Sequence, residues 1–249
     1  MIHPTKTLVA LAAVLALSSA PAAAQGRWLA SYPEVQDPVY AQMRTDLRQD
    51  RMLEGMTDPM NEVFRVPRDL TIEIAECGTP AATYDSPSAT IRICYELIME
   101  LIEQEDAPDP GGLDNFDDAF AFILLHQVGH AVIDVLQLDV GVSPEEAADQ
   151  FVAVMAGMAP GELDGLVDGV AALQDLELDW ETPDTGATTI DSRRGATLTC
   201  LLYGGNPDAH ANLVEQGELT SSRATDCIAE FAEAQARWTT LLESHLNQG

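Results

Sequence analysis

Positively charged side chains are scarce in this sequence. It contains 12 lysine and arginine residues against 41 aspartate and glutamate residues, which gives a formal net charge of −29. Lys6 is the only lysine, so almost all of the basic side chains are arginines. Such a charge repels nucleic acids and anionic membrane surfaces and argues against both as partners. Attraction of basic ligands is a weaker interpretation, because salt screens surface charges over about 8–10 Å.

Long hydrophobic runs are absent after the first 24 residues, which themselves form a short basic lead, the apolar run TLVALAAVLAL and the small residues SSAPAAA. This order predicts a secretory signal peptide over residues 1–24, cleaved after Ala24, because a membrane-spanning helix needs about 20 apolar residues. We therefore expect a periplasmic or secreted protein with no membrane attachment after cleavage. Residues 25–60 are expected to form an irregular or helical arm, and residues 61–249 the main domain.

Cysteines are few, and none of the four belongs to a CxxC pair. This spacing argues against a zinc site built from cysteines. In an exported chain an even number of cysteines indicates disulfides, and four cysteines allow three pairings. We favour Cys77–Cys94, across a predicted hairpin, and Cys200–Cys227, between two predicted helices.

The apolar pattern predicts a small sheet followed by many helices. Residues alternate between apolar and polar in LTIEIAECG (70–78), as they do in a half-buried strand, and ATYDSPSATIRICY (82–95) predicts two strands joined by a turn at residues 85–87. The strongest helical pattern runs over residues 114–138, and a second helix over 144–158 is expected to begin with Ser143 as its N-cap. The sequence therefore predicts an α+β protein. Further helices are expected within residues 162–178, 191–205 and 222–246.

Histidine is also rare, yet two of the five histidines lie four residues apart in FILLHQVGHAVIDVL (122–136). On a helix, His126 and His130 would share one face with their Cβ atoms about 5–6 Å apart, and two imidazoles placed in this way can bind one Zn²⁺. The alternative is a pair of ordinary core histidines, but burying them without a shared partner is costly. His210 and His245 are expected to be ordinary surface histidines.

A zinc site needs a third ligand, and the next predicted helix offers one. Glu145 opens an ExxAD pattern in EEAAD, and a short connection lets this helix pack against the histidine helix. Glu146 is the alternative ligand. Asp149, one turn beyond Glu145, can accept the free N–H of a metal-bound histidine and fix its orientation.

The residue that follows His126 is Gln127, where the zinc-peptidase motif HExxH has a glutamate. That glutamate takes a proton from the zinc-bound water and passes it to the leaving amine. A neutral amide cannot do so, and general acid–base catalysis is worth about 10²–10⁴ in rate. Metal binding does not require the glutamate, so we expect a zinc site with weak or no hydrolysis. Asp134 and Glu146 are carboxylates that could replace the missing base.

The stretch FILLHQVGHAVIDVLQLDV, followed by EEAADQF, resembles the zincin metallopeptidases of the glutamate-ligand type. Together with ECGTPAATYDSPSATIRICYELI, RRGATLTCLLYGGNPD and RATDCIAEFAEAQARWTTLL, it is similar to a narrower family of exported bacterial metallopeptidase-like proteins. The resemblance implies a zincin-like fold, the two favoured disulfides, and zinc held by His126, His130 and Glu145. Arg194 and Arg223 match arginines of that family, and we expect them to pair with carboxylates.

Two functions are therefore expected in the first instance. One is a zinc metallopeptidase that cleaves a peptide or protein substrate with impaired proton transfer. The other is a pseudopeptidase, a protein of the same fold that binds zinc or peptides without catalysis. A helical protein that holds no metal is a third interpretation, which leaves the paired histidines unexplained.

Overall fold

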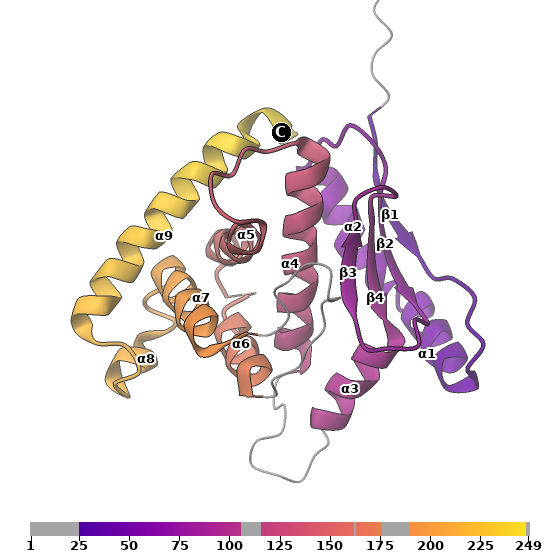
Figure 1. The fold of residues 1–249 in the computed structure, drawn as a ribbon, viewed down its shortest axis with the longest axis horizontal. Coiled ribbons are helices and arrows are strands. Elements are labelled where there is room, and N and C mark those ends of the chain that lie inside the picture. The colour runs from indigo at the N-terminus through magenta and orange to yellow at the C-terminus, as the bar shows by residue number, and fades with distance from the viewer. Residues whose placement is uncertain (1–24, 106–115, 162, 176–189, 248–249) are drawn as a thin grey trace, which may run out of the picture.

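The computed structural model describes residues 25–105, 116–161, 163–175 and 190–247. A small sheet lies on one side of the molecule and helices make up the other side (Figure 1), which confirms the predicted α+β class. The predicted signal peptide and the predicted start of the 114–138 helix lie outside the described residues.

The sheet has the strand order β1-β2-β4-β3. Strands β2 and β4 lie within the stretches that alternation predicted, and their isoleucines are fully buried. β1 and β4 both run parallel to β2, whereas β3 runs antiparallel to β4 and forms one edge. The bounds are β1 (Trp28–Ser31), β2 (Leu70–Ala75), β3 (Ala82–Asp85) and β4 (Thr90–Cys94).

Residues 25–60, for which the sequence indicated an irregular or helical arm, contain both helices and a strand. They form the helix α1 (Pro38–Gln49) and most of α2 (Met52–Val63), and Asp37 caps α1 by accepting a hydrogen bond from the Val39 amide at 2.8 Å. They also supply β1, which the sequence did not indicate and which pairs with β2. This region thus completes the sheet, while the domain boundary at residue 61 stays a prediction.

Helix α4 is the centre of the molecule, between the sheet and the later helices (Figure 1). It contacts β3 and β4 on one side and α5 and α6 on the other. By length and composition it is the one helix among the described residues that could cross a membrane, but 72% of its apolar window is buried, as in a core helix. The helices are α3 (Tyr95–Glu105), α4 (Phe116–Leu136), α5 (Pro144–Met158), α6 (Leu166–Asp175), α7 (Ser192–Gly205), α8 (Ala211–Glu215) and α9 (Ser221–Leu242), followed by the short 3-10 helix η1 (Glu243–His245).

A glycine lets α4 and α5 approach each other closely. A Cβ atom on Gly129 would lie 3.0 Å from the Cα of Ala148, so a larger residue there would push the helices apart. Gly129 directly precedes His130, and Ala148 directly precedes Asp149. The tight contact therefore brings the polar residues of the two helices together.

Two disulfides join segments that lie apart in the sequence. Cys77 is bonded to Cys94 and Cys200 to Cys227, with Cα–Cα distances of 5.6 and 5.0 Å. Both favoured pairings are confirmed, and the second ties α7 to α9. Disulfides persist in oxidising compartments, so the two disulfides suggest an extracellular or periplasmic environment.

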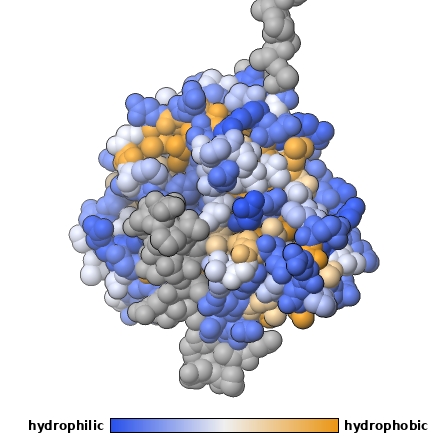
Figure 2. Space-filling view, turned by 45° about the vertical axis from the view of Figure 1, so that its right-hand side comes forward, coloured by the Kyte–Doolittle hydropathy of each residue, from blue (hydrophilic) through white to orange (hydrophobic). Residues whose placement is uncertain are grey.

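The face seen in Figure 2 is largely hydrophilic, with apolar side chains gathered in separate patches.

Candidate metal centre

The helix that carries the predicted carboxylate begins as the sequence indicated, and it packs against the helix that carries the paired histidines. Ser143 caps α5 by accepting a hydrogen bond from the Glu146 amide at 3.2 Å, and Pro144 occupies the first turn. This cap places Glu145 in the first turn of α5, opposite the histidine face of α4. His126 is fully buried, and His130 is partly exposed beside it.

Three side-chain groups converge between α4 and α5. The Nε2 atoms of His126 and His130 lie 3.0 Å apart, and the carboxylate oxygens of Glu145 lie 3.2 Å from the first and 3.4 Å from the second. Ligands held at about 2.0–2.1 Å from a tetrahedral Zn²⁺ are separated by roughly 3.3 Å. The three groups therefore fit three corners of such a tetrahedron, and they can hold a metal ion.

Glu146 does not join this group. Its side chain is exposed, and its Oε1 accepts a hydrogen bond from Nε2 of the Gln150 side chain at 3.2 Å. Of the two carboxylates that the sequence offered as a third ligand, the geometry thus favours Glu145. The described residues contain a second group of potential ligands at Cys77, Cys94 and Glu96, but its two cysteines are consumed by a disulfide.

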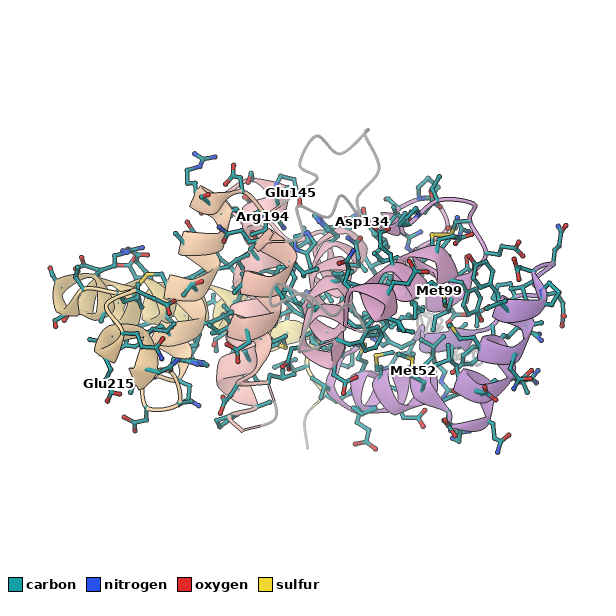
Figure 3. The ribbon with its side chains drawn as sticks, turned by 90° about the horizontal axis from the view of Figure 1, so that it is seen from below. Met52, Met99, Asp134, Glu145, Arg194 and Glu215 are labelled. Carbon is teal, nitrogen blue, oxygen red and sulfur yellow. A yellow bond between two sulfur atoms is a disulfide. The ribbon has the colours of Figure 1, made fainter. Side chains whose placement is uncertain are left out.

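Asp149 and Arg194 contact the His126 ring at Nδ1. Asp149 Oδ1 lies 2.9 Å from His126 Nδ1, as the ExxAD pattern suggested. Donation of the Nδ1 proton to Asp149 leaves the Nε2 lone pair facing His130 and Glu145, which is the tautomer that a metal ligand needs. Arg194 at the start of α7 donates to both oxygens of Asp149 at 2.8 Å. Figure 3 shows Arg194 beside Glu145, where its Nη2 is 4.0 Å from Oε2.

The sequence did not predict that Arg194 lies beside His126. Its expected pairing with a carboxylate is found, and Arg223 likewise pairs with Glu230. However, Nη2 of Arg194 also lies 3.3 Å from His126 Nδ1. The only sequence signal was the match to a family arginine, which carried no information on this neighbour.

Both carboxylates have a lowered pKa. Burial raises the pKa of Glu145, but the hydrogen bonds with His126 and His130 outweigh burial and hold it well below its ordinary value. Burial also opposes ionisation of Asp149, and hydrogen bonds from His126 and Arg194 again keep its pKa below the ordinary value. Both groups are therefore ionised at neutral pH, the form that binds and orients a metal site.

A cavity of about 590 Å³ opens beside the three groups. Gln127 lines it and is only 2% exposed, so the neutral amide stands in the cavity wall next to the metal group. The other walls come from the edge strand β3 and from the start of α5. The lining residues are Ala82, Thr83, Tyr84, Ser86, Gln127, His130, Ile133, Asp134, Ser143, Pro144 and Glu145.

The comparison with protein families agrees with a metal site of the peptidase type. Residues 32–242 match a family described as "Putative metallopeptidase". The chain belongs to this family. The match covers strands β2 to β4 and helices α1 to α9, and it agrees with the resemblance that the histidine and cysteine blocks indicated. No curated protein and no solved structure matches the chain significantly.

Asp134 is the remaining carboxylate in the cavity of this metallopeptidase-family member. It accepts hydrogen bonds from the Tyr84 hydroxyl at 2.6 Å and from Arg68 Nη2 at 3.1 Å. Burial and this contact with Asp134 raise the pKa of Tyr84. Asp134 is thus already engaged by two donors, and Glu146 does not line the cavity, so neither carboxylate is placed as an obvious substitute base.

The two other histidines of the described chain lie outside the metal group. His245 is partly exposed, but His210 is only 7% exposed, so the prediction of a surface histidine is wrong for His210. It directly precedes α8, and its main-chain amide donates to the main-chain oxygen of Asn206 at 3.3 Å. Burial lowers the pKa of His210.

Proposed function

We propose that this protein is an exported zinc metallopeptidase-like protein whose hydrolysis of peptide bonds is slowed by Gln127. The observation that carries this proposal is the convergence of His126, His130 and Glu145, with ligand atoms 3.0–3.4 Å apart. Two imidazoles and one carboxylate form a set that suits Zn²⁺ and leaves a coordination position open for water or substrate. Family membership supports the same reaction class.

Each residue of the site has a definable part in this chemistry. When bound, zinc supplies an acidified water and polarises the scissile carbonyl. Asp149 and Arg194 hold the His126 ring so that Nε2 faces the site. Gln127 can donate or accept a hydrogen bond and so can orient a water molecule, but its amide cannot take up the proton. Proton transfer must therefore rely on solvent or on the leaving group, which is slow.

The edge strand β3 supports a peptide as the substrate. The Cys94 amide donates to the Ala81 oxygen at 2.9 Å, and antiparallel pairing alternates from there along the ladder with β4. Ala82 and Tyr84 consequently direct their main-chain N–H and C=O groups away from β4. No described strand pairs with β3 on that side, and these residues line the cavity. An extended peptide can add to such an edge through main-chain hydrogen bonds.

Gln127 also favours a second candidate function, a pseudopeptidase that binds zinc and peptides without cleaving them. Its amide replaces the proton acceptor while leaving the three ligand groups and the edge strand in place. Export is supported for both candidates by the disulfides and by the predicted signal peptide. Hydrolysis alone separates the two.

Metal content measured together with activity tests the proposal. The protein should carry about one zinc per chain after supplementation, because three ligands hold the ion. Zinc-loaded protein should release peptides slowly from casein, and a chelator should stop the release. Less than about a tenth of a zinc per chain would overturn the metal site. Full zinc content without hydrolysis would favour the pseudopeptidase.

A further inference from the structure

A second cavity, of about 730 Å³, adjoins the first at the C-terminal end of α4. Asp134 lines both cavities, so they meet at this residue. We call the second cavity the arginine pocket. The polar residues that line it are Gln25, Arg65, Arg68, Asp134, Gln137, Ser244 and His245.

The arginine pocket has a small excess of positive charge, because Arg68 is paired with Asp134 at 3.1 Å and Arg65 has no carboxylate partner among the residues that line the pocket. In a chain with a net charge of −29, two arginines and one histidine meet here. Asp134 is the only acidic residue among the described residues that line the pocket, and Arg68 and Tyr84 already bind it. Arg65 donates to the neutral main-chain oxygen of Ser244 at 2.5 Å, a bond that does not offset its charge. The pocket therefore favours an anion.

The end of α4 satisfies two of its last main-chain carbonyl groups next to the pocket. The Leu138 amide donates to the Ile133 oxygen at 2.9 Å, and the Gln137 amide donates to the Asp134 oxygen at 3.0 Å. These bonds close the helix in the way that normally places glycine at the left-handed position. Here that position is Gln137, with φ 53°, and it lines the pocket. A residue other than glycine kept in this sparsely populated backbone conformation beside a cavity is consistent with a binding role.

The pocket lies at a definite distance from the metal group. Gln137, the residue after α4, lies seven positions beyond His130, which corresponds to about 10 Å along a helix axis. An extended peptide covers that distance in about three residues. Arg68 lies at the C-terminal end of β3, because its Nη2 donates to the main-chain oxygen of Ser86, the residue after β3, at 2.9 Å. A peptide that follows β3 past His130 thus reaches the arginine pocket.

We propose that Arg65, Arg68 and His245 form a subsite that binds a carboxylate of the peptide, about three residues from the bond at the metal group. The inference rests on the proposed function, and it adds a preference for acidic peptides. The carboxylate belongs either to an aspartate or glutamate side chain or to the C-terminus of the peptide. Either source would receive charge-assisted hydrogen bonds from the guanidinium groups.

Peptide binding measured by fluorescence anisotropy tests the subsite without depending on hydrolysis. The probes are fluorescein-labelled, amidated ten-residue peptides of Ala, Val, Thr and Ser, in which one aspartate or one asparagine occupies each position in turn. A separate probe has the neutral sequence with a free C-terminal carboxylate. We expect the aspartate to tighten binding about tenfold over asparagine at one favoured position, or the free carboxylate to do so. This gain should shrink as salt is raised.

Variants connect the gain to the pocket. The double variant Arg65→Gln/His245→Gln should lose the preference for the carboxylate. The control Arg48→Gln on α1, which also replaces an arginine by glutamine but at an exposed position outside the pocket, should keep it. The single variant His245→Gln should lose part of the preference, and urea midpoints should show that each variant is folded. Equal binding of the acidic and neutral peptides would overturn the subsite while leaving the peptide cleft intact. An unchanged preference in the double variant would also overturn it, and failure of every peptide to bind would reject the cleft itself.

Discussion

Arg194 grips both oxygens of Asp149, with its Nε 2.8 Å from Oδ2 and its Nη2 2.8 Å from Oδ1. Asp149 in turn contacts the His126 ring, so α7, α5 and α4 are joined through three side chains. The side chains of the pair are only 13% and 9% exposed. A buried ion pair of this kind is expensive to break from one side, because the remaining charge loses its partner.

Arg194→Gln should therefore destabilise the metal-free protein by about 3 kcal/mol, since it leaves the Asp149 carboxylate buried without its cation. Urea unfolding followed by circular dichroism measures the change. The matched control is Arg223→Gln, which breaks the exposed pair with Glu230 on α9 and should cost less than about 1 kcal/mol. Equal losses for the two variants would contradict a special role for the buried pair.

The stability of the metal-free protein should depend on pH through Asp149. Its folded pKa lies below the ordinary value despite burial, because His126 and Arg194 hydrogen-bond the ionised form. The resulting stability is complete above the unfolded pKa of about 3.9 and is lost as the pH falls through the folded pKa. Urea midpoints between pH 7 and pH 3 should fall more gently in Asp149→Asn than in the wild type. Parallel curves would show that other carboxylates govern the acid response.

Local features of the fold were predictable, whereas the contacts between distant segments were not. Ser143 and Pro144 mark the start of α5 through the chemistry of their own side chains, so the cap was correctly predicted. The strand β1 is too short to show a pattern, and its pairing of Trp28 with Leu70 joins distant parts of the chain. Arg194 reaches Asp149 across 45 residues, and only the packing of α7 on α5 brings them together.

The candidate site divides in the same way. The spacing of His126 and His130 indicated one shared face, and the ExxAD pattern favoured Glu145 over Glu146 as the third ligand. The fold brings Glu145 to the two histidines. Placement of Gln127 in the cavity wall agrees with its position in the motif. Arg65 and His245 both line the arginine pocket, although Arg65 lies in the first third of the chain and His245 lies near its end. No local pattern reports such a meeting.

Removal of a proposed ligand should release the metal. Glu145→Gln leaves two imidazoles and a neutral amide, so we expect zinc content to fall from about one to well below half an equivalent per chain under dialysis. Metal analysis of the purified protein measures this. Glu146→Gln is a close control, because it alters the adjacent residue, whose side chain contacts Gln150 instead. Loss of zinc from the control but not from Glu145→Gln would exchange the two assignments.

The disulfide between α7 and α9 should contribute substantially to stability. Cys200 and Cys227 are 27 residues apart, and a closed loop of that length restricts the unfolded chain by about 3–4 kcal/mol. The double variant Cys200→Ser/Cys227→Ser should lower the free energy of unfolding by that amount, as measured in urea. Reductant should then change its stability only through the remaining Cys77–Cys94 bond. A loss below about 1 kcal/mol would show that helix packing alone fixes α7.

Gln127→Glu is the change that most directly addresses catalysis. A glutamate of nearly the same shape would stand in the cavity wall beside the metal group and could accept and return a proton. General acid–base assistance is worth about 10²–10⁴ in rate, so we expect casein hydrolysis by the zinc-loaded variant to rise at least about tenfold. Gln127→Ala should not show this gain, because it also removes the amide but supplies no base. The gain should appear in kcat, since a proton transfer acts in the transition state. If Gln127→Glu binds a full equivalent of zinc and still hydrolyses no faster, the cavity does not hold a competent peptidase site, and the pseudopeptidase becomes the better description.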